Sequence, residues 1–119
     1  MKNHKIVHME IPFTDLNQAK EFYERVFDWE ITLTTGYEDY AFFKDAEDGI
    51  GGAFQKSDKP IEDGIMLYIN VDDIPKLLDE VEKAGGKKIQ DKTKISDEHG
   101  FYAVFKDSCG NLMGLWSRS

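Results

Sequence analysis

The fold is decided by the stretch Ile6-Val7-His8-Met9-Glu10-Ile11 and by the segment that follows it as far as Trp29. The odd-numbered positions of this stretch are apolar, whereas His8 and Glu10 fall on the opposite face, as in a strand with one dry face. Apolar residues then recur at helical spacing, namely Ala19, Phe22, Tyr23, Val26 and Phe27. The pattern predicts a strand that leads into an amphipathic helix.

A second strand and helix of the same kind run from Ile65 to Ile89. Within the strand, Ile65, Leu67, Ile69 and Val71 form the apolar set, and Met66, Tyr68 and Asn70 form the other. The repetition indicates two similar halves, because two long repeats are too few for a solenoid.

Both helices carry start signals. Thr14 or Asp15 stands where a side chain can cap the first helix, and Asp72 or Asp73 stands there for the second. Pro75 follows in the first turn of the second helix, a position that tolerates proline because the missing N–H would have no helical partner.

Further strands follow each helix. We expect them at residues 29–34, 40–43 and 50–55 in the first half, and at 87–92, 101–106 and 112–116 in the second, with a loop at 94–99. Residues 57–64 form a polar linker. The prediction is an α+β fold in one domain, 1–119, built from two βαβββ modules at about 4–56 and 64–118. Together they form a curved mixed sheet around a cup, with the helices on the outer face.

Composition narrows the class of function. The chain has 119 residues, a net charge of −8 and one cysteine, Cys109. An acidic surface without a Lys/Arg stripe disfavours nucleic-acid binding, and a single cysteine fits a reducing compartment. No apolar run approaches the ~20 residues of a membrane span or forms a secretory signal. We expect a soluble cytoplasmic protein.

Several short motifs together resemble the vicinal oxygen chelate superfamily, also called the glyoxalase/bleomycin resistance/dioxygenase superfamily. They are His8-Met-Glu-Ile-Pro, Asp15-Leu16, Phe22-Tyr23, Phe27-Asp28-Trp29, Tyr68-Ile-Asn-Val-Asp72-Asp73 and Phe105-Lys-Asp107-Ser-Cys-Gly110-Asn111. Their order covers essentially the whole chain. The resemblance implies paired βαβββ modules around a pocket, often in a homodimer.

The resemblance also implies where metal ligands would lie. Metal-dependent members use four positions, which here carry His8, a strand in which only Gln55 could ligate, Met66 and Gly114. Because Met66 is a poor ligand for hard ions and glycine is none, we expect no resident cofactor. The alternative is a divalent ion (Zn, Ni, Mn or Fe) held by His8 and Gln55.

The expected ligand site combines aromatic and polar side chains of the cup, namely Phe54, Met66, Tyr68, Asn70, Tyr102 and Trp116. Such a lining suits a small apolar or aromatic molecule, whereas for any single aromatic residue ordinary core is the commoner role. His8 and Glu10 are the candidate acid–base pair. The alternatives are a metal-dependent lyase or isomerase of the lactoylglutathione lyase kind, a dioxygenase, and a non-catalytic protein-interaction module.

Overall fold

The computed structural model describes residues 4–119, the side chains of Thr34 and Tyr37 excepted, so the expected domain start at residue 1 lies outside it. Its first half contains β1 (Met9–Phe13), α1 (Leu16–Phe27), β2 (Glu30–Thr34), β3 (Tyr37–Lys44) and β4 (Gly52–Lys56). Its second half contains β5 (Tyr68–Asn70), α2 (Ile74–Lys83), β6 (Lys87–Ser96), β7 (Gly100–Lys106) and β8 (Leu112–Ser117).

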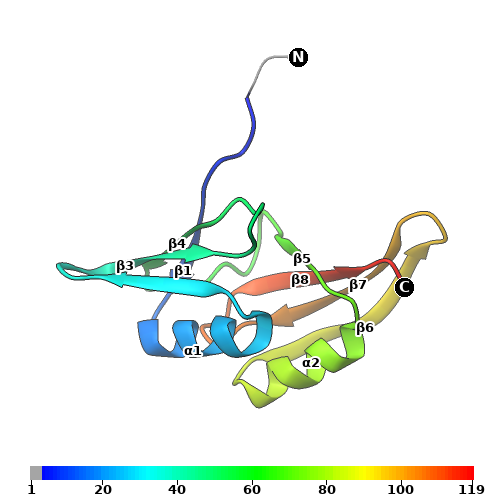
Figure 1. Ribbon diagram of the computed structural model, residues 1–119. Helices are drawn as coiled ribbons and strands as arrows, with labels where there is room; N and C mark the ends of the chain where they lie inside the picture. The colour runs from blue at the N-terminus through cyan, green and yellow to red at the C-terminus, as the bar shows by residue number, and fades with distance from the viewer. Residues whose placement is uncertain (1–3) are drawn as a thin grey trace.

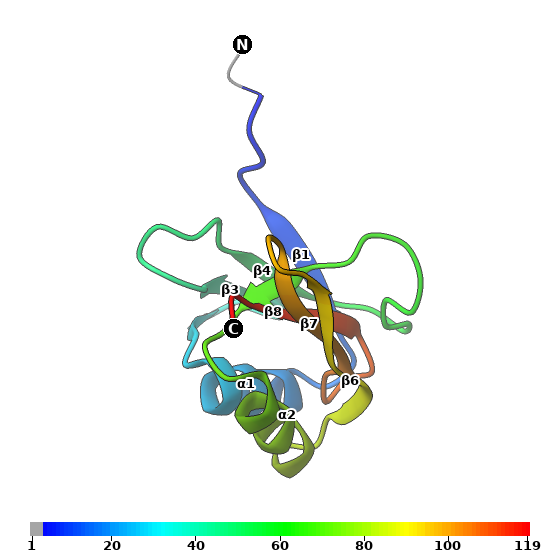
Figure 2. The same ribbon diagram turned by 90° about the vertical axis from the view of Figure 1, so that its right-hand side faces the viewer.

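The strands form two four-stranded sheets of the same design. Their orders are β1-β4-β3-β2 and β5-β8-β7-β6. The pairs β1–β4 and β5–β8 are parallel, and all other neighbouring pairs are antiparallel. Both helices lie on one side of the sheets (Figures 1 and 2). The predicted α+β fold of two βαβββ modules is confirmed.

The capping signals predicted both helix starts. Asp15 accepts a hydrogen bond from Gln18 N at 3.2 Å at the start of α1. Asp73 accepts one from Lys76 N at 3.1 Å at the start of α2. Each carboxylate satisfies an N–H that has no partner within its helix. Neither helix is long and apolar enough to cross a membrane.

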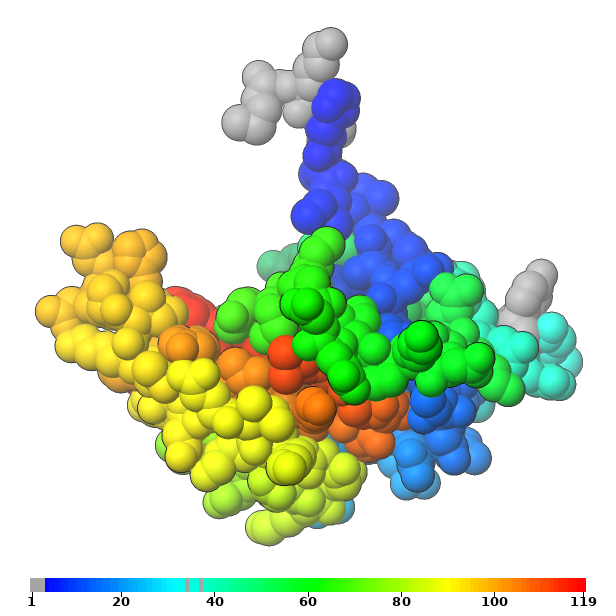
Figure 3. Space-filling view, turned by 180° about the vertical axis from the view of Figure 1, so that it is seen from behind, coloured from blue at the N-terminus to red at the C-terminus, as the bar shows by residue number. Residues whose placement is uncertain are grey.

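Two predicted strands are shorter than the alternation suggested. The β1 ladder begins with Met9 opposite Gly52, so Ile6 and Val7 precede the pairing and are 73% and 67% exposed. The dark-blue segment before β1 rises away from the rest of the molecule (Figure 3). Ile65 likewise lies before β5 and is 82% exposed, so its expected place on the dry face is wrong. Alternation gives the face of a residue but cannot show whether a neighbouring strand reaches it.

Strand β6, in contrast, is longer than predicted. This strand runs to Ser96, and Lys94 pairs with Phe101, so part of the loop expected at residues 94–99 is strand. A β-branched residue alternates with lysine at Thr93 and Ile95, which is a strand signal. The strand ends in a short turn that leads into β7, and this hairpin lies at the outer edge of the second sheet (Figure 1).

An aromatic core lies between α1 and the sheets. Trp29 stacks on Phe43 at 4.6 Å and on Tyr23 at 4.7 Å between ring centroids. Phe54 lies in the same cluster, 5.2 Å from the Tyr23 ring, and is 0% exposed. The expectation that Phe54 lines the cup is therefore wrong, because its position on β4 faces the helix side together with Ile11.

The helix α1 also joins the two halves. Its Phe22 stacks on Phe105 of β7, with 6.1 Å between the ring centroids. The hydroxyl of Tyr23 donates to Asp107 Oδ2 at 2.7 Å, and the side chain of Asn111 donates to the same oxygen at 2.9 Å. We call Tyr23, Asp107 and Asn111 the buried node. Burial raises the pKa of Asp107, against the effect of these donors, and raises that of Tyr23 well above its usual value.

Candidate functional site

The sheet face opposite the helices, which we call the open face, carries most of the predicted site residues. Register places Glu10, Tyr40 and Gln55 on it in the first sheet, since their neighbours Ile11, Ala41 and Phe54 are buried against the helix side. In the second sheet it carries Tyr68, Asn70, Tyr102 and Trp116, which pair with one another or with Gly114. The open face therefore presents polar groups on one sheet and aromatic groups on the other.

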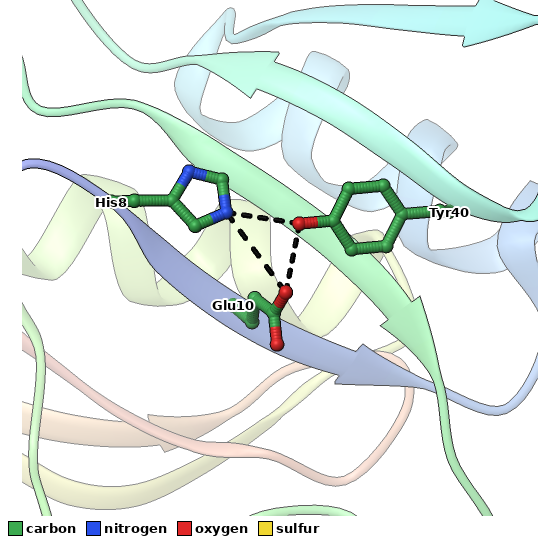
Figure 4. Close-up of polar contacts among 3 residues, drawn as sticks. All are labelled: His8, Glu10 and Tyr40. Carbon is green, nitrogen blue, oxygen red and sulfur yellow. Dashed lines mark hydrogen bonds and ion pairs between the residues drawn. The ribbon is translucent and has the colours of Figure 1, made fainter.

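Three side chains meet on the first sheet, and we call them the polar cluster (Figure 4). The hydroxyl of Tyr40 donates to Glu10 Oε2 at 2.8 Å and lies 2.9 Å from His8 Nε2. His8 Nε2 is 4.0 Å from the same carboxylate oxygen. The predicted pair of His8 and Glu10 is thus brought together, with Tyr40 between them.

The hydrogen bonds of the polar cluster assign its protons. A tyrosine hydroxyl has one proton, and here it goes to the carboxylate of Glu10, which can only accept. His8 must then donate its Nε2–H to the Tyr40 oxygen, so a neutral ring has its free lone pair on Nδ1. The hydrogen bond to Glu10 also raises the pKa of Tyr40, so the phenol stays protonated to a higher pH than an isolated tyrosine does. The arrangement can accept a proton at His8 Nδ1, and the Glu10 carboxylate can stabilise the resulting imidazolium through the Tyr40 hydroxyl.

An aromatic hollow lies on the second sheet. It has a volume of about 390 Å³ and is lined by Tyr68, Ile95, Tyr102 and Trp116. The indole N–H of Trp116 donates to His99 O at 2.7 Å. Gln90 Nε2 donates to the Tyr102 hydroxyl at 2.8 Å. Both hydrogen bonds fix ring orientations, so the hollow is preformed.

The structure separates the remaining predicted residues. Met66 lies before β5 and outside the aromatic hollow. Asn70 lies on the open face but lines a different pocket, between the two sheets. Gln55 is the exception, since it sits opposite Tyr40 on β4 and lines a pocket together with Glu10. Within residues 4–119, no hydrogen bond or ion pair joins the polar cluster to the aromatic hollow.

Sequence reasoning missed Tyr40 and Ile95. Tyr40 alternates with the buried Ala41, which places it on the open face, but its distance from Glu10 depends on the β3–β4 register across the turn at 45–51. Ile95 was missed because residues 94–99 were expected to form a loop. The alternation of Thr93 and Ile95 with lysines nevertheless indicates a strand there.

The donor set does not fit the metal site that the resemblance implies. Residues 4–119 hold no group of three or more His, Cys, Asp or Glu side chains placed to bind an ion, masked side chains aside. His8 Nε2 is engaged by Tyr40. At Gly114, where a carboxylate would stand, an added Cβ would overlap the ring of Tyr68. The aromatic ring therefore occupies the space that a fourth ligand needs, and zinc or similar ions require three or four ligands.

The family model and a related sequence both point to one protein family. Residues 5–115 match the model of the glyoxalase/bleomycin resistance protein/dioxygenase superfamily. A glyoxylase-like domain-containing protein of Didymella fabae is 28% identical over 120 residues, which cover 96% of this chain and 94% of that protein.

Solved structures show the same fold. A glyoxalase/bleomycin resistance protein/dioxygenase family enzyme of Burkholderia phytofirmans superposes with a TM-score of 0.78 at 16% identity, covering 97% of this chain and 99% of that one. The E126Q variant of the fosfomycin resistance protein FosX of Listeria monocytogenes, solved with Mn(II) and 1S,2S-dihydroxypropylphosphonic acid, gives 0.74 at 17% identity, covering 97% and 90%. With the family model spanning nearly the whole sequence, this chain belongs to the glyoxalase/bleomycin resistance protein/dioxygenase superfamily.

Proposed function

We propose that this protein binds a flat apolar or aromatic small molecule in the aromatic hollow, without a metal ion. The observation that carries the proposal is the convergence of Tyr68, Tyr102 and Trp116 around a space of about 390 Å³. Ligand pockets of about 300–1,000 Å³ lined by aromatic side chains are typical of small-molecule sites. Members of this superfamily bind small molecules, as the phosphonate complex of the Listeria protein shows for that protein.

The missing ligand position supports the same proposal. Gly114 leaves room for the Tyr68 ring to lie over β8, so the loss of a carboxylate creates one aromatic wall of the hollow. The rim includes the Tyr102 hydroxyl and its partner Gln90, which can orient a polar substituent of the ligand. The ligand class is therefore an aromatic ring with a hydroxyl or carbonyl group.

Trp116→Ala should weaken binding of 2-naphthol about tenfold, because it removes the largest stacking surface, a loss of ~1.4 kcal/mol. The measurement is isothermal titration calorimetry on both proteins. Phe42→Ala is the matched control, since Phe42 is an aromatic on the open face of the other sheet and is 51% exposed. Equal weakening by both variants, or no saturable binding to the wild type, would reject the proposal.

The second candidate function is acid–base catalysis by the polar cluster. It is favoured by the hydrogen bonds that Tyr40 makes to both His8 and Glu10. His8 is then the base, and Glu10 stabilises the positive charge that develops on the ring. If the protein turns over a substrate, His8→Ala removes that turnover and leaves the fold intact, and unchanged turnover would exclude this function.

The polar cluster has a spectroscopic signature. Because the hydrogen bond to Glu10 raises the pKa of Tyr40, its phenol should ionise at higher pH than an isolated tyrosine, and Glu10→Gln should lower that pKa. An ultraviolet pH titration measures both, with Tyr40→Phe identifying the signal by its loss. A Tyr40 titration that Glu10→Gln does not move would show that the hydrogen bond is absent in solution.

A further inference from the structure

A second pocket lies at the seam between the two sheets. The strands β1 and β5 are edge strands, each paired with only one neighbour in its sheet. Met9 of β1 and Tyr68, Ile69 and Asn70 of β5 line this pocket together. The pocket has a volume of about 470 Å³ and reaches from the open face toward the core. We call it the seam pocket.

The floor of the seam pocket is apolar, and methionine side chains there can adapt their conformation. Trp29, Phe43 and Met113 lie at the bottom, and each is less than a tenth exposed. Met9 of β1 and Ile69 of β5 form the two walls. Methionine side chains adapt to irregular ligands and contact aromatic rings favourably. The floor therefore suits a phenyl ring or an alkyl chain.

The rim of the seam pocket carries acceptors. Asp45 and Asn70 both line it. Asp45 Oδ1 accepts the backbone N–H of Gly51 at 2.8 Å, which fixes the carboxylate. In the described part of the chain, Asp45 makes no ion pair with Lys, Arg or His. A fixed, half-buried carboxylate beside an aromatic floor provides a charge for a cation.

We propose that the seam pocket is a second ligand site and that it takes a primary ammonium carried on an aromatic or alkyl chain. The chain lies over Trp29 and Met113, and the ammonium donates to Asp45 and to the amide oxygen of Asn70. The proposed ligand of the aromatic hollow is neutral, so charge separates the two sites. They share the Tyr68 side chain as a common wall.

The test uses three probes of equal shape, namely 4-phenylbutylammonium, 4-phenylbutan-1-ol and 4-phenylbutyrate. The two tryptophans report the two sites by NMR, because Trp29 lines the seam pocket and Trp116 lines the aromatic hollow. Loss of a peak in Trp29→Phe or Trp116→Phe assigns each indole N–H signal. We expect the ammonium to move the Trp29 signal and to bind about three- to tenfold more tightly than the alcohol at pH 7.

Asp45→Asn should abolish this preference, because it removes the charge while its amide oxygen can still accept the Gly51 N–H. Asp63→Asn is the matched control, since Asp63 also accepts a glycine N–H, that of Gly64 at 2.9 Å, but lies outside the seam pocket. If Asp45→Asn does not fold, added NaCl on the wild type serves instead and should weaken the ammonium but not the alcohol.

The possible results separate cleanly. A Trp29 shift with ammonium preference, lost in Asp45→Asn and kept in Asp63→Asn, supports the proposal. Equal affinities of the three probes, a shift of Trp116 alone, or no shift up to the solubility limit overturns it. Because binding of 2-naphthol is tested by calorimetry with the Trp116→Ala variant, failure in the seam pocket leaves the proposal for the aromatic hollow standing, and the reverse also holds.

Discussion

Asn111→Ala is expected to lower the free energy of unfolding by about 3–4 kcal/mol, since it leaves several buried polar groups without partners. Asn111 is 1% exposed. Its side chain donates to Pro12 O at 2.7 Å and to Asp107 Oδ2 at 2.9 Å, and its amide oxygen accepts from Ile61 N at 2.8 Å. One side chain thus ties β1, the linker between the halves and the turn before β8.

Urea denaturation followed by circular dichroism measures this loss. Asn17→Ala is the control, because Asn17 is exposed on α1 and should change the stability by no more than about 0.5 kcal/mol. A loss in Asn111→Ala no larger than that of the control would mean that the buried node does not hold the halves together.

The effect of Asn111→Ala should depend on pH. Burial already raises the pKa of Asp107 in the folded protein, and losing the side-chain donor of Asn111 raises it further. A raised pKa in the folded state means that protonation favours folding, so the deficit is largest at neutral pH and shrinks as the pH falls through the raised value. A deficit that grows as the pH falls from 7 toward the usual aspartate range would contradict this account.

Gly52→Ala is the second large effect, with an expected loss of about 3 kcal/mol from overpacking. A Cβ on Gly52 would overlap the carbonyl oxygen of Met9, which is backbone and cannot rotate away. The substitution should push β1 from β4 and thereby separate Glu10 from Tyr40, because the β1 ladder starts at the pair of Met9 and Gly52.

Amide hydrogen exchange locates this damage. Exchange at Ile11 and Phe13 in β1 should accelerate more than exchange in the second sheet. Gly36→Ala is the control, since no atom that the structure describes lies within 4 Å of its added Cβ, and its φ of +90° opposes the change. If Gly36→Ala costs as much as Gly52→Ala, the close approach of β1 and β4 is not the cause.

The local sequence pattern correctly predicted the features that depend only on residues close together in the chain. The periodicity of Phe22, Tyr23 and Val26 gave the buried side of α1, and Asp15 and Asp73 gave the two helix starts. Strand alternation placed Tyr68, Tyr102 and Trp116 correctly on one face. These features follow from side-chain direction and hydrogen bonding within a few residues.

The predictions that were wrong concern features that depend on how the strands pair. Alternation at Ile6 and Ile65 continued past the point where a partner strand ends. Phe54 went to the core because β4 pairs with β1 in the register that aligns it with Ile11. Register between strands joined by a long connection is set by packing across the whole sheet, which no local window contains.

The sequence by itself determined two βαβββ modules, the caps of their helices and a resemblance to the family whose model the chain matches. Only the tertiary structure decided that Tyr40 joins His8 to Glu10, that the Tyr68 ring fills the space beside Gly114, and that the seam between the sheets is open. Each of these depends on contacts between segments far apart in the chain, and such contacts follow from the packing of complete elements rather than from the residues on either side.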